Sequence, residues 1–241
     1  MGLFDMFGGG GSKVEKLQKA ATQKFGPPEN RQKALDSLVE INTPEAIGAL
    51  LKRFTIAVDP SITDRDEKEF TYRAIVDKGV AAVEPLKQFV MNSDSGIAWA
   101  LKALNALLTP PDLAAHVIAV LTKVGNDYTR DPEKKVVLLS HLGDLDDPRT
   151  PAAVIPFLED PADDVKTTSA KVLAKAKDDD AVRVALLDAL VRDHDKKRVQ
   201  AALLDALSTA GFKVESHREK IAPLVSDPFT LGKDGLIARK P

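Results

Sequence analysis

The chain has 241 residues, of which 44% are hydrophobic and 29% charged, and its 34 basic and 36 acidic residues leave a net charge of −2. This length allows a large buried core, and the balanced charge provides no general attraction to phosphate backbones or anionic lipid. Cysteine is absent, which excludes disulfides, thiolate metal sites and a cysteine nucleophile. We expect a cytoplasmic protein, because no secretory signal is present and no apolar run approaches the ~20 residues that cross a bilayer.

Residues 1–12, MGLFDMFGGGGS, differ in composition from the rest of the chain. Glycine at the density of this segment predicts a flexible tether. The apolar residues before it could anchor the chain to a partner, or make weak peripheral contact with a membrane through residues 1–7. The segment could equally be a disordered chain end. The residues of the proposed anchor are Leu3, Phe4, Met6 and Phe7.

Apolar residues recur at helical spacing over residues 13–227, which predicts a helical body. Helix stop and start signals such as GPPEN at 26–30 and DPADD at 160–164 interrupt this pattern repeatedly. They supply capping side chains, often with proline in the first helical turn. Segments of ~10–15 residues lie between them, so we expect about thirteen helices in antiparallel pairs.

Six short segments align in one register, and their last residues follow one another at steps of 37, 32, 35, 31 and 34 residues. A unit of this length is too short to bury its own apolar face, so its repetition is typical of stacked helical arrays. The register therefore predicts an all-α fold, a right-handed α-α superhelix (α-solenoid) of about six helix pairs. The aligned residues are Leu38, Ile75, Leu107, Leu142, Leu173 and Leu207.

Three first helices contain a proline at a matching place, namely Pro85, Pro156 and Pro223. With the segment LGDLDDPRTPAAVIPFLEDPADDVKTTSAKVLAKA at 142–176, these prolines make the repeat resemble the HEAT family, within the broader ARM-like fold, and especially its short bacterial form named after phycobilisome lyases. The resemblance implies that an Asp after the first helix pairs with a base in the second. The residues at those positions are Asp160 and Lys166. Other repeats keep the base alone, at Arg31, Lys68 and Lys135.

The tail, residues 228–241, breaks the helical pattern. Its KDG sequence lies between FTL and LIA, and Asp-Gly suits a two-residue turn, so the tail could form a small hairpin. An isolated hairpin is marginal in water. We therefore expect it to fold back on the last helix or to act as a docking strand.

The sequence contains no motif typical of a catalytic site. The four histidines lie in different repeats without metal-ligand spacing, and the only glycine run lacks the Lys-Ser/Thr of a phosphate loop. Acidic clusters such as Asp178–Asp180 lie at helix starts, where carboxylates complement the backbone dipole. We expect no enzyme activity, no metal and no cofactor.

The residue two before each aligned position should be solvated on the second-helix face, and all six such residues are polar. Two are acidic, two basic and two neutral, which argues against a groove that follows phosphates. They are Asp36, Arg73, Asn105, Ser140, Lys171 and Asp205.

The sequence thus favours a non-enzymatic protein-protein interaction scaffold or adaptor, which binds a protein or peptide on a concave surface of mixed charge. Trp99 either anchors the partner or fills the inter-repeat core. The partner-binding residues expected are Arg73, Trp99, Lys102, Asn105, Tyr128, Ser140 and Lys171.

Two alternatives remain open. One is a chromophore-lyase-like accessory subunit. The other is a nucleic-acid-binding protein that resembles HEAT-like DNA glycosylases and uses a cluster of basic residues. That cluster comprises Lys134, Lys135, Lys171, Lys196, Lys197 and Arg198.

Overall fold

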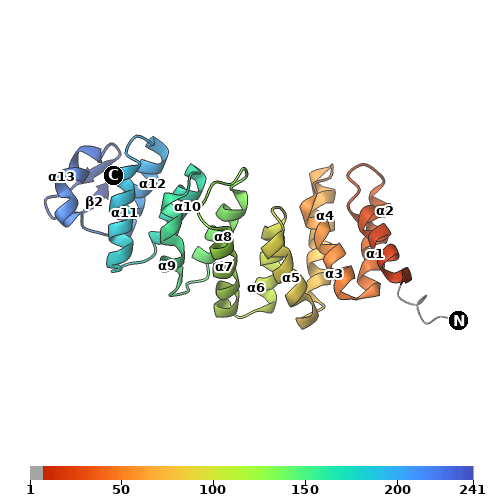
Figure 1. Ribbon diagram of the computed structural model, residues 1–241. Helices are drawn as coiled ribbons and strands as arrows, with labels where there is room; N and C mark the ends of the chain where they lie inside the picture. The colour runs from red at the N-terminus through yellow and green to blue at the C-terminus, as the bar shows by residue number, and fades with distance from the viewer. Residues whose placement is uncertain (1–7, 241) are drawn as a thin grey trace. The chain divides into compact units, whose positions relative to one another are not determined.

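The computed structural model describes residues 8–240, and nearly all of its regular structure is helical (Figure 1). This part of the chain holds 13 α-helices and one two-stranded sheet, which confirms the all-α class predicted from the sequence. The chain divides into two compact units, Met1–Leu113 and Ala114–Pro241.

In the first unit, the helices form two layers. First helices pack on first helices (α1 on α3, α3 on α5), second helices pack on second helices (α2 on α4, α4 on α6), and the layers meet within each pair. The first helices are α1 (Gly8–Ala21), α3 (Pro44–Leu51), which continues as the 3-10 helix η1 (Lys52–Thr55), and α5 (Val80–Asn92). The second helices are α2 (Pro28–Ile41), α4 (Ser61–Val76) and α6 (Ile97–Leu107).

The division between the units falls inside α7 (Pro110–Val124). The second unit repeats the two-layer arrangement: α8 packs on α10 and α10 on α12, while η2 packs on α11 and α11 on α13. Its second helices are α8 (Glu133–Gly143), α10 (Asp163–Leu173) and α12 (Lys197–Ala210). Its first helices are α9 (Thr150–Val154) with η2 (Ile155–Glu159), α11 (Asp180–Arg192), and the short run η3 (Glu215–His217), α13 (Arg218–Ile221) and η4 (Ala222–Leu224).

Side-chain caps begin α3 and α11, whereas α2, α4 and α10 begin without a hydrogen bond to the side chain of the N-cap residue. The Thr43 hydroxyl accepts a hydrogen bond from the amide of Ala46 at the start of α3. At the start of α11 the Asp179 carboxylate accepts one from the amide of Val182. These bonds satisfy amides that have no partner within the helix. Gly211 closes α12 in the left-handed conformation, with φ of 71°, where a side chain would be strained.

The aligned prolines change the helix type at two of their three positions. The chain passes from α9 into η2 just before Pro156 and from α13 into η4 just before Pro223, whereas α5 remains α-helical through Pro85. Proline has no amide to donate to the preceding turn, and a 3-10 turn accommodates that loss. Two of the three first helices therefore tighten at the aligned proline.

The aligned apolar register is confirmed at five of its six positions. Leu38, Ile75, Leu142, Leu173 and Leu207 are at most 1% exposed, whereas Leu107 is half-buried and Leu104, one turn earlier, is fully buried. Leu107 is the last residue of α6.

The first helix begins earlier than the sequence suggests. Helix α1 starts at Gly8, so Gly8–Ser12 are helical rather than part of a tether. Each glycine disfavours a helix by about 1 kcal/mol relative to alanine, but α1 packs on both α2 and α3. The remainder of the expected tether, residues 1–7, lies outside the described residues.

The expected hairpin is present. Strands β1 (Phe229–Leu231) and β2 (Ile237–Arg239) pair antiparallel, with Leu231 opposite Ile237. Its loop is longer than the two-residue turn predicted, because Gly232 and Gly235 are joined by a backbone hydrogen bond and the Gly232 amide donates to Leu236. Strand β2 packs on α12 (Figure 1), so the tail folds back on the last long helix.

Candidate functional site

The exposed face of the second helices matches the predicted polar register. All six residues two before the aligned positions are exposed: Asp36, Arg73, Asn105, Ser140, Lys171 and Asp205. Because a helix has 3.6 residues per turn, these residues lie on a different face from the aligned apolar residues two positions later. Each unit therefore presents a polar surface of mixed charge on its second-helix layer.

In the first unit this surface carries an aromatic cluster around the only tryptophan. The Trp99 ring stacks on Phe54, with centroids 5.7 Å apart and planes 12° from parallel, and Tyr72 lies tilted at 6.4 Å. Phe54 is buried, whereas Trp99 and Tyr72 are half-buried. One face of the Trp99 ring therefore packs inward on Phe54, and part of the ring stays accessible.

The stack of Trp99 on Phe54 depends on Gly96. This glycine lies directly before α6 with φ of 73°, and a Cβ there would lie 2.5 Å from the carbonyl oxygen of Phe54. Only glycine allows the start of α6 to approach η1 this closely. The approach brings Trp99, in the first turn of α6, onto the Phe54 ring.

Charged groups extend the aromatic cluster. The Lys102 ammonium group lies 4.1 Å from the Tyr72 centroid and 4.8 Å from that of Trp99, and it donates to Glu69 at 3.0 Å. Arg73 reaches the other oxygen of Glu69 at 3.4 Å. The hydrogen bond from Lys102 is the main cause that lowers the pKa of Glu69. We call Tyr72, Trp99, Lys102, Glu69 and Arg73 the aromatic–cation patch.

In the second unit a groove of about 530 Å³ crosses the exposed face of α8, α10 and α12. Lys171 forms no ion pair with any described residue, while Arg198 donates to Asp164 at 2.6 Å. The groove therefore offers one free ammonium group among carboxylates. We call it the second-helix groove, and it is lined by Asp131, Pro132, Glu133, Val136, Asp164, Thr167, Thr168, Lys171, Arg198 and Ala202.

The seven predicted partner-binding residues thus fall into two groups. Arg73, Trp99 and Lys102 come together in the aromatic–cation patch, and Asn105 is exposed on the same helix as Lys102. The other three belong to the second unit. Lys171 lies in the second-helix groove, Ser140 is exposed on α8, and Tyr128 is 77% exposed in the connection before α8.

Half of the basic cluster considered for nucleic acid is bound to carboxylates. Lys135 pairs with Asp160, and Lys196 pairs with both Asp163 and Asp193. Lys134 is only 8% exposed. Arg198 is also paired, whereas Lys171 and Lys197 form no ion pair with a described residue.

The predicted pairing of Asp160 with Lys166 is wrong. Asp160 binds Lys135, from the preceding second helix, at 2.6 Å, and Lys166 binds Asp193, which follows the next first helix, at 2.5 Å. The other Asp160 oxygen accepts the Ala162 amide in a tight turn, which directs the carboxylate towards α8. Each acid therefore links to the base of the preceding repeat rather than to that of its own.

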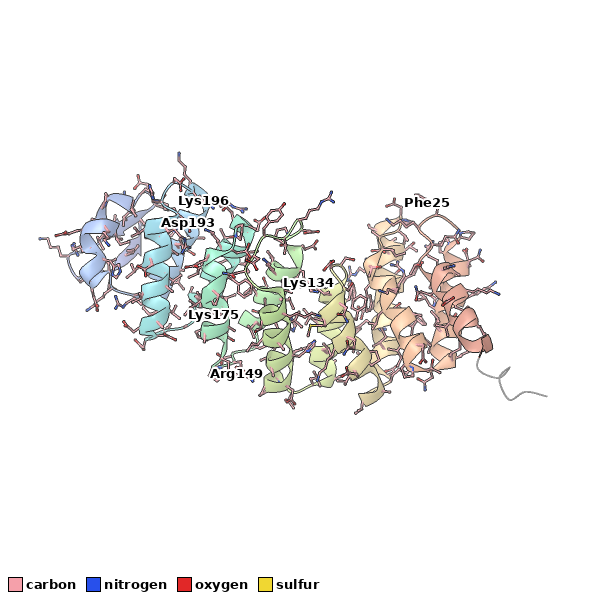
Figure 2. All side chains as sticks on the ribbon, in the orientation of Figure 1. Phe25, Lys134, Arg149, Lys175, Asp193 and Lys196 are labelled. Carbon is pink, nitrogen blue, oxygen red and sulfur yellow. The ribbon has the colours of Figure 1, made fainter. Side chains whose placement is uncertain are left out.

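Asp193, the acid that pairs with Lys166, has further cationic side chains around it. Figure 2 labels Asp193, at the end of α11, and Lys196, which precedes α12; their charged groups lie 3.6 Å apart. Burial of Asp193 would raise its pKa, but hydrogen bonds from Lys166 and Arg192 outweigh burial and lower the pKa. Bonds to Asp163 raise the pKa of Lys196. These groups therefore remain charged when folded.

A second charged network, in the first unit, was not predicted. Glu67 accepts from Arg31 at 2.9 Å and from Arg53 at 2.8 Å, and these three side chains are at most 6% exposed. Arg53 also binds Asp64 at 2.7 Å. Hydrogen bonds from Lys68 and Arg53 lower the pKa of Asp64 against the opposing effect of burial. The available signal was the location of Arg53 next to apolar Leu50, Leu51 and Phe54.

The described residues contain no group of three or more His, Cys, Asp or Glu side chains that could hold a metal ion. Burial lowers the pKa of His141, which favours the neutral imidazole. No helix in the described part of the chain has the length and apolarity needed to cross a membrane. The anchor residues Leu3, Phe4, Met6 and Phe7 lie outside the described residues.

No family model matches this sequence, and no curated protein shows significant similarity to it.

Proposed function

We propose that this chain is a non-enzymatic HEAT-like α-solenoid that binds a protein partner through the exposed face of its second helices. The observation that supports the proposal best is the second-helix groove. Its lining includes Lys171 and other residues on the face of the second helices that packing within the chain leaves exposed to solvent. Its lining mixes both charge signs, which suits a polypeptide with side chains of both signs.

The aromatic–cation patch provides a second contact of the kind that contributes strongly to protein interfaces. Tryptophan, tyrosine and arginine are enriched among residues whose truncation weakens binding most. Trp99 and Tyr72 are held in place by the Phe54 stack and by Lys102, so little side-chain freedom would be lost on binding.

A nucleic acid partner fits these surfaces less well. Affinity for nucleic acid rises with the number of phosphates that lysine and arginine neutralise. The basic cluster instead pairs Lys135, Lys196 and Arg198 with carboxylates of this chain.

The test is affinity capture from native extract, followed by calorimetry with the purified partner. The groove variant carries Lys171→Glu and Arg198→Glu, and its control carries the same charge change at the exposed residues Lys177 and Lys220. Lys102→Glu tests the patch, with Lys24→Glu, at an exposed residue in the turn before α2, as control.

We expect both controls to retain the partner, and we expect the groove and patch variants to bind it at least about tenfold more weakly. Equal binding by all variants would overturn the assignment of these surfaces. Recovery of nucleic acid in place of protein, with strongly salt-dependent affinity, would overturn the protein-partner proposal.

A further inference from the structure

A groove of about 610 Å³ runs between the first helices α3 and α5 of the first unit, away from the second-helix residues discussed above. Its walls are mainly apolar. Leu51 and Phe89 are buried at its base, while Ala81 is exposed along α5. We call it the first-helix groove, and its lining is Pro44, Glu45, Gly48, Leu51, Lys52, Ala81, Glu84, Pro85, Gln88, Phe89, Asn92 and Ser93.

Gly48 in this groove has no explanation within the folded chain. It lies inside α3, where glycine is less favourable than alanine, and its φ is not positive. A Cβ added at Gly48 would meet nothing within 4 Å. Neither backbone conformation nor packing within the chain therefore requires glycine. Glycine would be required at this position if another backbone approached α3 closely here.

Two opposite charges flank Gly48 on the same face of α3. Glu45 lies three residues before it and Lys52 four residues after it, a spacing that keeps all three on one side of a helix, and all three line the groove. Both charged residues are exposed, and neither forms an ion pair with a described residue. Lys52 lies 5.7 Å from the Phe89 ring centroid.

This charge pattern is complementary to itself. If a second α3 crosses antiparallel at Gly48, then Glu45 of each copy faces Lys52 of the other. The rise of a helix sets the two charges about 10 Å apart along α3, with Gly48 near the midpoint. A two-fold symmetric interface has this property, because residue i meets residue j twice.

We propose that the first-helix groove binds a second copy of this chain, through an antiparallel contact of α3 with α3 centred on Gly48. The absence of a side chain lets the two helices approach closely, the apolar walls supply the buried area, and two Glu45–Lys52 pairs set the register. This contact is independent of the partner-binding surface on the second helices.

The test is sedimentation equilibrium of the full chain over a wide range of concentration. We expect a monomer–dimer equilibrium that Glu45→Lys or Lys52→Glu each weakens at least about tenfold, because each change turns two attractive pairs into two repulsive ones. The controls Lys33→Glu and Glu40→Lys make the same changes at exposed α2 positions and should leave the equilibrium unchanged.

Two rescues distinguish this geometry from any other mode of association. The double variant Glu45→Lys/Lys52→Glu should dimerise again, because both pairs are re-formed with their signs reversed. An equimolar mixture of the two single variants should form a heterodimer, since one copy then carries two lysines and the other two glutamates. These rescues hold even if Glu45→Lys also lowers the melting temperature.

Gly48→Ala provides an opposed pair of effects. It should raise the melting temperature of the dilute monomer, because alanine favours the helix, and at the same time weaken the dimer. A monomer at every concentration would overturn the proposal, as would a dimer that Glu45→Lys and Lys52→Glu leave unchanged or whose loss neither rescue restores. Loss of an extract partner in these same variants, with the chain monomeric, would assign the groove to that partner instead.

Discussion

The carboxylate of Asp160 lies 2.6 Å from the ammonium group of Lys135, and both side chains are 1% exposed. The two residues belong to successive helix pairs, since Lys135 lies in the first turn of α8 and Asp160 follows η2. The Asp127 carbonyl also accepts from the same ammonium group, at 2.5 Å. The pair therefore joins one repeat to the next through the interior.

Asp160→Ala should destabilise the fold by about 3–5 kcal/mol, because it leaves the Lys135 charge buried without its partner. Replacing both residues, with Lys135→Met and Asp160→Leu, should restore much of the loss. Arg198→Gln is the control, because it breaks an exposed pair and should change stability by less than ~1 kcal/mol. Urea unfolding measures all three, and equal effects of Asp160→Ala and Arg198→Gln would contradict the assignment.

Leu104→Ala should destabilise the chain by about 2–5 kcal/mol, because Leu104 is fully buried and its truncation leaves a cavity. Leu107→Ala, three residues later on the same helix, should have a clearly smaller effect because Leu107 is half-buried. The two variants remove the same atoms from the same helix. The free energy of unfolding in urea separates them, and a larger loss at Leu107 would restore the original register.

Gly96→Ala should be more destabilising than Gly79→Ala. Both glycines have positive φ, so each substitution carries a backbone penalty of about 1–2 kcal/mol. Only at Gly96 does the new Cβ meet another residue, the Phe54 carbonyl at 2.5 Å, whereas nothing lies within 4 Å at Gly79. Gly96→Ala should also shift the fluorescence of Trp99. Unchanged emission with equal stability loss in both variants would argue against the close approach.

Stability should fall as the pH drops below about 4. The hydrogen bond from the side chain of Arg149 lowers the pKa of Asp147 from its ordinary value of 3.8 to about 2. A carboxyl whose pKa is lower in the folded state adds stability above its unfolded pKa, and this is lost as the pH falls through its folded pKa. Asp147→Asn should therefore reduce stability at neutral pH and flatten the loss between pH ~4 and ~2.

Asp66→Asn is the control for this experiment, since Asp66 is exposed on α4. It should leave the acid profile unchanged in denaturant unfolding measured against pH. An identical profile for wild type and Asp147→Asn would contradict the contribution of the Arg149 pair.

Phe229→Ala should destabilise the second unit by about 3–5 kcal/mol, because Phe229 is 5% exposed in the hairpin. Thr230→Ala, the next residue along, should have little effect since that side chain is exposed. Thermal unfolding followed by circular dichroism compares the two. Equal melting temperatures would show that the hairpin adds nothing to the stability of α12.

The sequence predicted the helical class and the polar positions of the second helices, because helical periodicity alone separates buried Leu142 from exposed Ser140. The same periodicity predicted that Leu107 is buried, whereas the side chain is half-buried. Periodicity gives the face on which a residue lies, but it does not say whether a further helix covers that face.

The site was predicted less completely, since its contacts join distant segments. The stack of Trp99 on Phe54 depends on the backbone at Gly96, and Asp160 pairs with Lys135 of the preceding helix pair rather than with Lys166 of its own. The burial of Arg53 and Glu67 runs against the usual exposure of charged residues. Each of these features is decided by three-dimensional approach rather than by residue type.

The hairpin has a consequence for how the array could grow. Phe229 and Ile237 are buried in the hairpin and β2 packs on α12, so a further helix pair appended to the tail would have to displace the hairpin in order to pack on the same side of α12. Lengthening by duplication would succeed only at an internal boundary, such as the turn between α10 and α11. A fusion partner attached after Lys240, which is exposed, should leave the array intact.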